Sequence, residues 1–466
     1  MFRFLHRIRQ RTIIKTRNGD QYSILKELFV EIPCSVLYMF IFITNWIKSS
    51  QEKCQIMGYK RSSVCRRKQV LLFLLCVSTL STYLTVKLVY VHREVPVDEA
   101  AIQWEEKMCK NYSSLIDGKE INTGNNKKYL ITWYNVSPYI KLRPEAMERS
   151  FKPCKYNNCE LSLCKRTAEL SDAVLFNGRR LPKKYEYKRP MGQIWIFVED
   201  ETPYTYDFDT EQWRTKFWRP AFNWTMTYDR KTTDIYLSSG EIWKKKSPDS
   251  RDFLSIAKNK TRGALLISSH CSTESKRTEY VKELQKYVDV DILGSCGRKW
   301  ECGIRWVHDD CFGILNTTYR FYLAFENALC RDYRTEKFFE NFNYDIILVE
   351  RAGISAEDKI EPKDAYISTK DFPDAQSLGK RLKTLSDDID EYSKFLERKS
   401  QYYFPGFQEP YQTALCNLCE KMNAQEKYHR NIPDLLDEHA QLLTSCKDPT
   451  DIEVDGGFFR WLFRKW

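Results

Sequence analysis

Short apolar runs bounded by charged or turn-forming residues recur in the sequence, and their length is typical of β-strands. Structured sequence begins near "YLITWYN" at residue 129. The run "IWIFV" is followed directly by acidic residues, which indicates a buried strand that ends at a polar edge. The predicted strands are "IWIFV" (194–198), "TTDIYLS" (232–238), "GALLISSHC" (263–271), "DVDIL" (289–293), "RFYLAFEN" (320–327) and "DIILVE" (345–350).

Helical patterns separate the strands in the second half of the chain. The segment "YRTEKFFENF" (333–342) places three phenylalanines on one side of a helix, with Asp332 as a plausible N-cap. Residues 273–288 are amphipathic, and 377–404 carry a long helical pattern. Strands that alternate with helices predict an α/β fold with a parallel, doubly wound sheet.

Polar residues lie where two of these strands end. Ser269 and His270 follow one strand, and Glu326 and Asn327 follow another. Ligands of doubly wound sheets bind at the carboxyl ends of the strands, so these positions predict a binding site. Residues 321–342 read as a strand, a tight turn and the start of a helix, an arrangement that leaves backbone N–H groups free for an anion. Arg334 and Lys337 would add positive charge there. A solvated helix start with charged side-chain pairs fits the same pattern.

The N-terminal region carries most of the net charge of +11 and the targeting information. Residues 1–68 hold 14 Lys or Arg against 4 Asp or Glu, so the rest is nearly neutral and predicts no nucleic-acid partner. Val70–Val86 contains 17 uncharged residues, can extend to Val91, and follows four basic residues. This pattern predicts a single membrane anchor at 70–91 with the following residues in the lumen.

Downstream features favour the lumenal placement. Twelve of the 16 cysteines follow the anchor, an even number that suits an oxidising compartment. A second apolar stretch, Ile32–Ile47, lies at the membrane surface, spans the membrane or precedes a true start at Met57, and the sequence does not choose between these. Five N-x-S/T sequons also follow the anchor, at Asn111, Asn135, Asn223, Asn259 and Asn316.

Composition shifts divide the chain into six parts. The polar cluster 244–252 is a linker between the two α/β halves. The predicted parts are a cytosolic region (1–69), an anchor (70–91), a stem (92–128), a first domain (129–258), a second domain (259–404) and a cysteine-containing C-terminal tail (405–466).

The segment "LISSHCSTESKRTEYVKELQKYVDVDILGSCG" followed by "YRFYLAFENALCRDYRTEKFFENF" resembles the donor-binding region of the α1,3-fucosyltransferases, glycosyltransferase family 10. Weaker matches are "PMGQIWIFVEDETP", "FNWTMTYDR" and "DAYISTKDF", and the resemblance covers roughly 185–405. It implies a GT-B fold in which two Rossmann-like domains face a cleft. It also implies GDP-β-L-fucose as donor, a GlcNAc hydroxyl as acceptor, inversion of configuration, and no essential metal or other cofactor.

The resemblance also assigns residues. Two departures from the family pattern concern the predicted site: His270, where Asn is usual, and the strand and turn with Ile346 and Glu350, where Pro and Gly are usual. The positions that match the family's GDP contacts are Ser269, His270, Arg277, Tyr322, Asn327, Tyr333, Glu336 and Lys337.

An inverting transfer needs a base for the acceptor proton and cations for the departing diphosphate. Lys337 and Arg277 are the predicted cations. Counting from the strand Trp as in the family selects Glu201 as the base, with Glu199 as the next candidate. A solvated carboxylate at a strand end is the plain alternative for Glu201.

Two motifs that imitate metal sites are assigned other roles. The "DVD" run lies between a helix and a strand, where the family has a similar run without metal use. Cys416 and Cys419 form half of a zinc pattern, but no second CxxC follows, so disulfides are expected.

The order of cysteines is most like the invertebrate and plant branch, which fucosylates the innermost GlcNAc of N-glycans. The resemblance therefore implies a Golgi type II membrane enzyme with glycoprotein acceptors, and a homodimer is left open. Transfer to outer-arm GlcNAc and an inactive glycan-binding or nucleotide-binding relative remain as alternatives.

Overall fold

The computed structural model describes residues 109–116, 128–136, 150–205, 211–300, 312–354, 362–406 and 408–452, all within the compact unit Glu99–Trp466. The predicted anchor at 70–91 and both alternatives for the N-terminus lie outside the described residues. Within the described part, no helix is both long and apolar enough to cross a bilayer.

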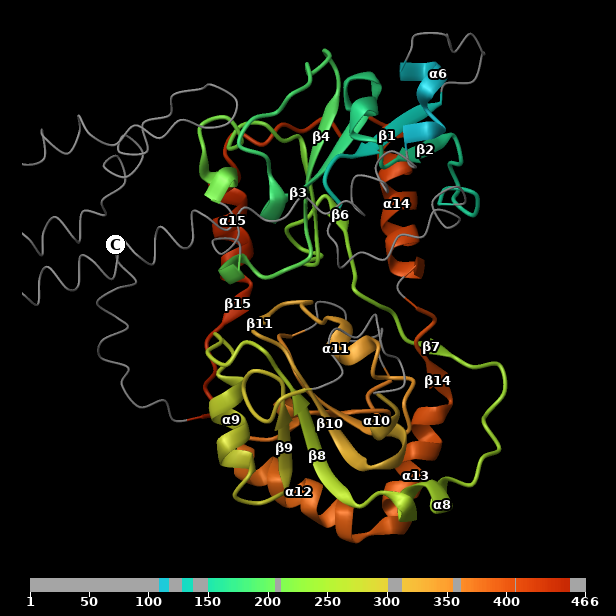
Figure 1. The fold of residues 1–466 in the computed structure, drawn as a ribbon, viewed down its shortest axis with the longest axis vertical. Coiled ribbons are helices and arrows are strands. Elements are labelled where there is room, and N and C mark those ends of the chain that lie inside the picture. The colour runs from blue at the N-terminus through green and yellow to red at the C-terminus, as the bar shows by residue number, and fades with distance from the viewer. Residues whose placement is uncertain are drawn as a thin grey trace, which may run out of the picture. The chain divides into compact units, whose positions relative to one another are not determined.

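The first half of the described chain forms a six-stranded parallel sheet with strand order β2-β1-β3-β4-β5-β6 (Figure 1). Neighbours in the middle of the sheet are joined by crossover connections, as the predicted doubly wound pattern requires. The strands are β1 (Tyr129–Trp133), β2 (Cys159–Ser162), β3 (Ala173–Asn177), β4 (Ile194–Glu199), β5 (Trp224–Thr227) and β6 (Ile235–Tyr236).

Each face of this first sheet is covered by a helix from the end of the chain. Helix α14 (Gln408–Asn423) packs Leu415 and Leu418 against one face, together with residues of β1, β3, β4 and β5. Helix α15 (Leu435–Thr444) packs Leu435 and Leu442 into the aromatic cluster on the other face. The segment predicted as a C-terminal tail is therefore built into the core of the first half.

The second half forms a five-stranded parallel sheet with order β13-β12-β10-β8-β9. The strands predicted at 263–271, 289–293, 320–327 and 345–350 are all present. Their bounds are β8 (Arg262–Ile267), β9 (Val290–Leu293), β10 (Tyr319–Phe325), β12 (Ile347–Arg351) and β13 (Ile367–Ser368). The predicted α/β class with two parallel sheets is confirmed.

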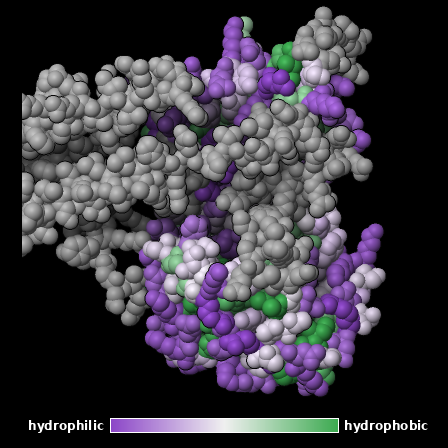
Figure 2. Space-filling model, viewed as in Figure 1, coloured by the Kyte–Doolittle hydropathy of each residue, from purple (hydrophilic) through white to green (hydrophobic). Residues whose placement is uncertain are grey.

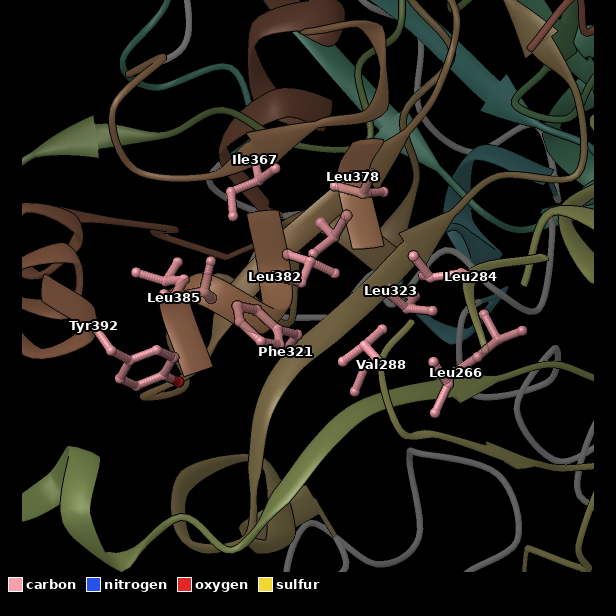
Figure 3. Close-up of a cluster of buried hydrophobic side chains, with 14 of the residues drawn as sticks. Leu266, Leu284, Val288, Phe321, Leu323, Ile367, Leu378, Leu382, Leu385 and Tyr392 are labelled. Carbon is pink, nitrogen blue, oxygen red and sulfur yellow. The ribbon is translucent and has the colours of Figure 1, made fainter. Parts of the chain in front are cut away.

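Two apolar layers enclose the second sheet. On one face Phe321 and Leu323 of β10 pack against Leu382 and Tyr392, which come from two long C-terminal helices (Figure 3). On the other face the alternate residues of β10, including Tyr322, pack with Phe338 and its neighbours. The helices are α8 (Phe253–Asn259), α9 (Arg277–Leu284), α10 (Gly313–Thr317), α11 (Glu336–Phe339), α12 (Ala375–Asp387) and α13 (Ile389–Ser400).

The predicted helices differ from the observed ones at their ends. The pattern at 377–404 is two helices, because the Asp388 side chain accepts from the Glu391 amide and starts α13. The amphipathic segment 273–288 becomes helical only at Arg277, after Lys276 with a φ of 53°. Short-range pattern did not reveal either boundary.

Small elements complete the fold. Strand β7 (Trp243–Lys244) pairs with β14 (Tyr402–Tyr403), and β11 (Leu329–Cys330) pairs with β15 (Cys446–Lys447). A short helix α6 (Ser113–Ile116) precedes the first sheet. The 3-10 turns are η1 (Lys165–Leu170), η2 (Gly178–Arg180), η3 (Pro203–Thr205), η4 (Glu211–Arg214) and η6 (Thr369–Asp371).

Ten of the cysteines after the predicted anchor form five disulfides. Cys416 and Cys419 bond to Cys154 and Cys159, which confirms that the CxxC pair is structural. The bond to Cys159 attaches α14 to β2, and the bond to Cys154 attaches it to the segment before that strand. The remaining bonds are Cys109–Cys164, Cys271–Cys296 and Cys330–Cys446.

Among the described residues, the face seen in Figure 2 is mostly hydrophilic, with smaller apolar patches. Lys260 is one of several charged residues that are buried. Its ammonium donates to the carbonyl oxygens of Leu315 (2.9 Å), Asn316 (2.9 Å) and Tyr319 (3.0 Å). Two of these carbonyls belong to the last turn of α10, where helical partners are lacking.

Replacement of Lys260 by Met should lower the free energy of unfolding by about 1–3 kcal/mol, because three buried carbonyls lose their donor. Burial lowers the pKa of Lys260 from 10.5 to about 7, so the unfolded chain holds more protons between these values. The parent protein should therefore gain stability relative to Lys260→Met as the pH rises from 7 to 10.5. Urea unfolding at several pH values measures both effects, with Lys258→Met on the exposed side of α8 as control. An unchanged midpoint would contradict the role of Lys260.

Candidate active site

The carboxyl edge of the second sheet brings together most of the residues predicted to contact the donor. Strand β10 ends at Glu326 and Asn327, β8 ends before Ser269, and α11 supplies Lys337. These parallel strands pair directly, so their ends meet at one edge of the sheet. The structure therefore places these predicted positions at one edge of the sheet.

The Lys337 ammonium is held at this edge by neighbouring polar side chains. Its ammonium lies 2.8 Å from the Thr335 hydroxyl, 3.1 Å from a Glu336 oxygen and 3.3 Å from a Glu326 oxygen. Burial opposes the charged form, but Glu326 and Glu336 outweigh it and raise the pKa of Lys337. The Lys337 side chain remains about one fifth exposed, so it is partly accessible at this edge.

The Glu326 carboxylate is held by the turn that precedes Lys337. Its carboxylate accepts from the Thr335 amide at 2.8 Å and from the Thr335 hydroxyl. Burial raises the pKa of Glu326, while Lys337 and these hydrogen bonds oppose that rise. The Glu336 side chain is nearly half exposed. Its partial burial acts to raise the pKa of Glu336, but the ion pair with Lys337 outweighs this and lowers it. The two carboxylates thus orient the ammonium.

The prediction that Asp332 caps the following helix is wrong. Thr335 is the N-cap of α11, and its side chain accepts from the Lys337 amide. Asp332 instead has a φ of 58° and its carboxylate accepts from the Arg230 amide at 3.2 Å. Asp can occupy the left-handed region more readily than most residues, and the contact to Arg230 favours this conformation here.

Arg277 lies beside Lys337 at the start of α9. Its guanidinium is buried and donates to the carbonyl oxygens of Phe325 (2.9 Å) and His270 (3.1 Å). Among the described residues its Nε has no hydrogen-bond partner, and burial lowers the pKa of Arg277. Ser269 and His270 are exposed, so His270 contributes its backbone carbonyl to this cluster.

The remaining predicted donor contacts separate into two groups. Tyr322 is buried in the apolar layer behind the edge, 4% exposed, and so lies under the site. Asn327 and Tyr333 instead turn toward a carboxylate of the first half. The Tyr333 hydroxyl donates to Glu201 at 2.8 Å, and the Asn327 amide lies 3.5 Å from the same oxygen.

Glu201 stands just after β4, at the carboxyl edge of the first sheet. Its side chain is about one third exposed, and its other oxygen lies 4.0 Å from Arg179. The Glu201 amide donates to Glu199 at 3.1 Å, which fixes the turn. A carboxylate that is both held and accessible can accept a proton from a bound hydroxyl.

The two neighbouring carboxyls are placed less favourably for that task. Glu199 is completely buried, and this burial, together with Asp200, raises its pKa well above the usual range. Burial beside Glu201 raises the pKa of Asp200 to about 6. Glu199 therefore acts as a support for Glu201 in this structure.

Sequence reasoning missed the residues that join the two halves next to Glu201. Arg331 donates to both oxygens of the fully buried Asp229, at 2.8 and 2.7 Å. Directly beside this pair, the rings of Tyr228 and Tyr333 lie 4.9 Å apart. Asp229 belongs to "FNWTMTYDR", a segment that already matched the family pattern. That match could have marked Asp229 as a site residue, but the sequence did not reveal Arg331 as its partner.

Glu350, which departs from the family pattern, is also paired. It is buried, forms an ion pair with Arg334, and accepts from the Ser368 hydroxyl at 2.9 Å. Despite burial, Arg334 and Lys370 lower the pKa of Glu350. Arg334 was predicted to add positive charge for an anion, but its charge is compensated by Glu350.

Replacement of Glu350 by Gln should destabilise the fold by about 3–5 kcal/mol, because the buried Arg334 guanidinium loses its facing carboxylate. The double variant Arg334→Met/Glu350→Leu should recover most of this loss, since apolar side chains of similar volume often replace a buried pair at little cost. Denaturant unfolding of the single and double variants gives the coupling energy. Independent, additive losses would show that the pair does not act as a unit.

The described residues contain no group of three His, Cys, Asp or Glu side chains arranged to hold a metal ion. Asp291 of the "DVD" run forms ion pairs with Arg262 and Arg298 and accepts from the Tyr319 hydroxyl at 2.6 Å. These contacts give Asp291 a structural role in the second half.

Comparisons with known proteins fit this arrangement. Residues 257–438 match the profile described as "Glycosyltransferase family 10 (fucosyltransferase) C-term", and residues 125–240 match "Fucosyltransferase, N-terminal". The chain is 27% identical over 321 residues to glycoprotein 3-alpha-L-fucosyltransferase A of Drosophila melanogaster, which covers 67% of this chain and 60% of that protein. It therefore spans less than two thirds of that relative.

Two further relatives are similar at lower coverage or lower identity. The chain is 28% identical to alpha-(1,3)-fucosyltransferase C of the same organism, over 66% of this chain and 72% of that protein. A crystal structure of an alpha1,3-fucosyltransferase with GDP-fucose has a TM-score of 0.41 and 15% identity, covering 66% and 95% of the two chains. The two matching profiles together span more than half of the chain, which belongs to glycosyltransferase family 10, the fucosyltransferases.

Proposed function

We propose that the protein transfers L-fucose from GDP-β-L-fucose to O3 of a GlcNAc residue, with inversion, and that the innermost GlcNAc of N-glycans is the acceptor. The observation that carries the proposal is the contact between residues at the carboxyl edges of the two parallel sheets. Lys337 and Arg277 lie at the carboxyl edge of one parallel sheet, and Tyr333 and Asn327 of the same half contact Glu201 of the other. Family membership supports the reaction class.

The diphosphate of the donor is assigned to the edge that carries Lys337 and Arg277. A fixed ammonium and a buried guanidinium oppose the negative charge that develops on the β-phosphate as the sugar leaves. Glu326 and Glu336 hold the ammonium in place, because both contact it. The reaction is proposed to need no metal, since these cations supply the required charge.

Glu201 is assigned as the general base. The acceptor O3–H gives its proton to the Glu201 carboxylate, O3 bonds to C1 of fucose, and the bond from C1 to the phosphate oxygen breaks. Tyr333 is assigned a positioning role, because its neutral hydroxyl donates to the carboxylate and leaves the other oxygen available. Burial and Glu201 raise the pKa of Tyr333 well above its usual range, which keeps it a donor.

The two-domain GT-B arrangement and a lumenal, Golgi-anchored topology belong to the same proposal. Five disulfides among the described residues support an oxidising compartment. The anchor is assigned to residues 70–91, with glycoproteins as the natural acceptors. The first relative named above is a glycoprotein fucosyltransferase, which favours a glycoprotein as the acceptor.

A non-catalytic binding role is the second candidate, favoured by the departure at Glu350. The pairing of Glu350 with Arg334 weakens that case, because the substituted carboxylate is compensated within the protein. Retention of Lys337, Arg277 and Glu201 in one constellation favours the enzyme.

Incubation of the full chain with GDP-fucose and a panel of N-glycans, analysed by mass spectrometry, tests the proposal. One added deoxyhexose on glycans with a free core GlcNAc O3 is the expected result. Addition to outer-arm GlcNAc alone would replace the acceptor assignment. GDP binding without transfer to any glycan would favour the binding role.

A further inference from the structure

The five sequons differ in whether the amide nitrogen of the asparagine is already used by the fold. Asn223 is buried, and its Nδ2 donates to the Arg430 carbonyl at 3.3 Å and to the Asn431 side chain. Its oxygen accepts from the Trp195 amide at 2.9 Å. A sugar on Nδ2 would remove one of these donors and displace the C-terminal segment from the first sheet.

Asn135 is engaged in the same way. Its Nδ2 donates to the carbonyl oxygens of Asn177 (3.2 Å) and Arg180 (2.7 Å), so both amide hydrogens have partners. Its oxygen accepts from the Asn177 amide at 2.7 Å. Substitution of one hydrogen by a sugar would break at least one of the bonds from Asn135 to the end of β3 and to the turn η2.

Asn259 and Asn316 are exposed, and their surroundings permit substitution. Asn316 uses its oxygen to accept from the Asp345 amide at 2.8 Å, and a glycosylated amide keeps that oxygen. Asn259 is the last residue of α8. The buried Lys260 beside it donates to the Asn316 carbonyl, so the two positions lie close together.

Both positions lie away from the proposed active site. Asn259 precedes β8 and Asn316 precedes β10, which places them at the amino ends of parallel strands. The site residues lie at the opposite, carboxyl edge of the same sheet. Glycans at Asn259 and Asn316 would therefore leave the site open. Asn111, near the Cys109–Cys164 bond, is a third exposed sequon.

We propose that Asn111, Asn259 and Asn316 carry N-linked glycans in the folded protein, and that Asn135 and Asn223 do not. In each modification a lipid pyrophosphate-linked oligosaccharide is the donor. The asparagine Nδ2 bonds to C1 of the first sugar, the bond from C1 to the pyrophosphate breaks, and Nδ2 loses one proton. The disulfides support exposure of the chain to the compartment where this reaction occurs.

Site occupancy can be measured on the folded chain purified from a eukaryotic secretory host. Amidase release of the glycans in ¹⁸O-water converts each modified Asn to labelled Asp, which peptide mass spectrometry locates. Label at Asn111, Asn259 and Asn316, with unlabelled Asn135 and Asn223, is expected. Label at Asn223 in folded protein, or none at Asn259 and Asn316, would overturn the assignment.

Matched variants separate modification from folding. Thr261→Ala and Thr318→Ala each remove one sequon without changing its asparagine. Each should abolish one glycosidase-sensitive step in gel mobility and leave fucose transfer unchanged. If either variant keeps every step, the corresponding asparagine is not a glycan acceptor. Because transfer activity is scored separately, failure of this proposal is distinguishable from failure of the proposed function.

Discussion

Replacement of Lys337 by Ala is expected to weaken binding of GDP about 10- to 100-fold and to lower turnover as well. Contacts with Glu326, Glu336 and Thr335 fix the ammonium within the fold, so its contact with a diphosphate costs little ordering. A charge-assisted hydrogen bond of this kind contributes about 1.5–3 kcal/mol, which corresponds to the expected weakening of GDP binding by about 10- to 100-fold. The same charge opposes the departing phosphate, so both binding and rate depend on it.

Removal of Lys337 also leaves Glu326 buried beside an uncharged side chain, which should raise the pKa of Glu326 further. A thermal unfolding curve is therefore needed with each titration, to show that the variant is folded. Calorimetry with GDP measures affinity, and Lys282→Ala on the exposed side of α9 is the matched control. Unchanged affinity in a folded Lys337→Ala protein would remove Lys337 from the diphosphate site.

Replacement of Glu201 by Gln is expected to lower turnover about 100-fold or more and to leave GDP affinity nearly unchanged. The amide keeps the shape of the carboxylate and can still accept from Tyr333, so the contact between the halves survives. It cannot take the acceptor proton. The effect of Glu201→Gln should thus fall on the rate alone, whereas the effect of Lys337→Ala falls on both quantities.

Initial rates at saturating GDP-fucose with a core N-glycan measure this difference. Glu169→Gln, on the surface of the first half, is the matched control. Near-normal turnover in Glu201→Gln would show that another group accepts the proton. Glu199 would be an unfavourable replacement, because it is fully buried and already accepts from the Glu201 amide.

Much of the second half was predictable, because its strands are apolar runs separated by helical patterns. The positions of Glu326, Asn327 and Lys337 at one edge follow from that alternation, since parallel strands end together. Helix boundaries were harder. The separation of α12 from α13 depends on a side-chain cap at Asp388, and the turn at Asp332 depends on the amide of Arg230.

Contacts between distant segments were not predictable from the pattern. The Arg331–Asp229 pair and the Tyr333–Glu201 hydrogen bond join residues more than 100 positions apart. The return of α14 and α15 to the first sheet was missed for the same reason, since their apolar faces do not specify a partner. Cysteine counting predicted that Cys416 and Cys419 are bonded, but the connectivity came from the structure.

The transfer reaction followed by proton NMR, with EDTA present, tests the central claim most directly. The account predicts that the anomeric signal of the β-linked donor falls while the signal of an α-fucosyl product rises at the same rate. It predicts attachment to O3 of GlcNAc in the absence of any divalent metal. Loss of the donor signal without an α1,3-linked product, or no change in a protein that binds GDP, would contradict it.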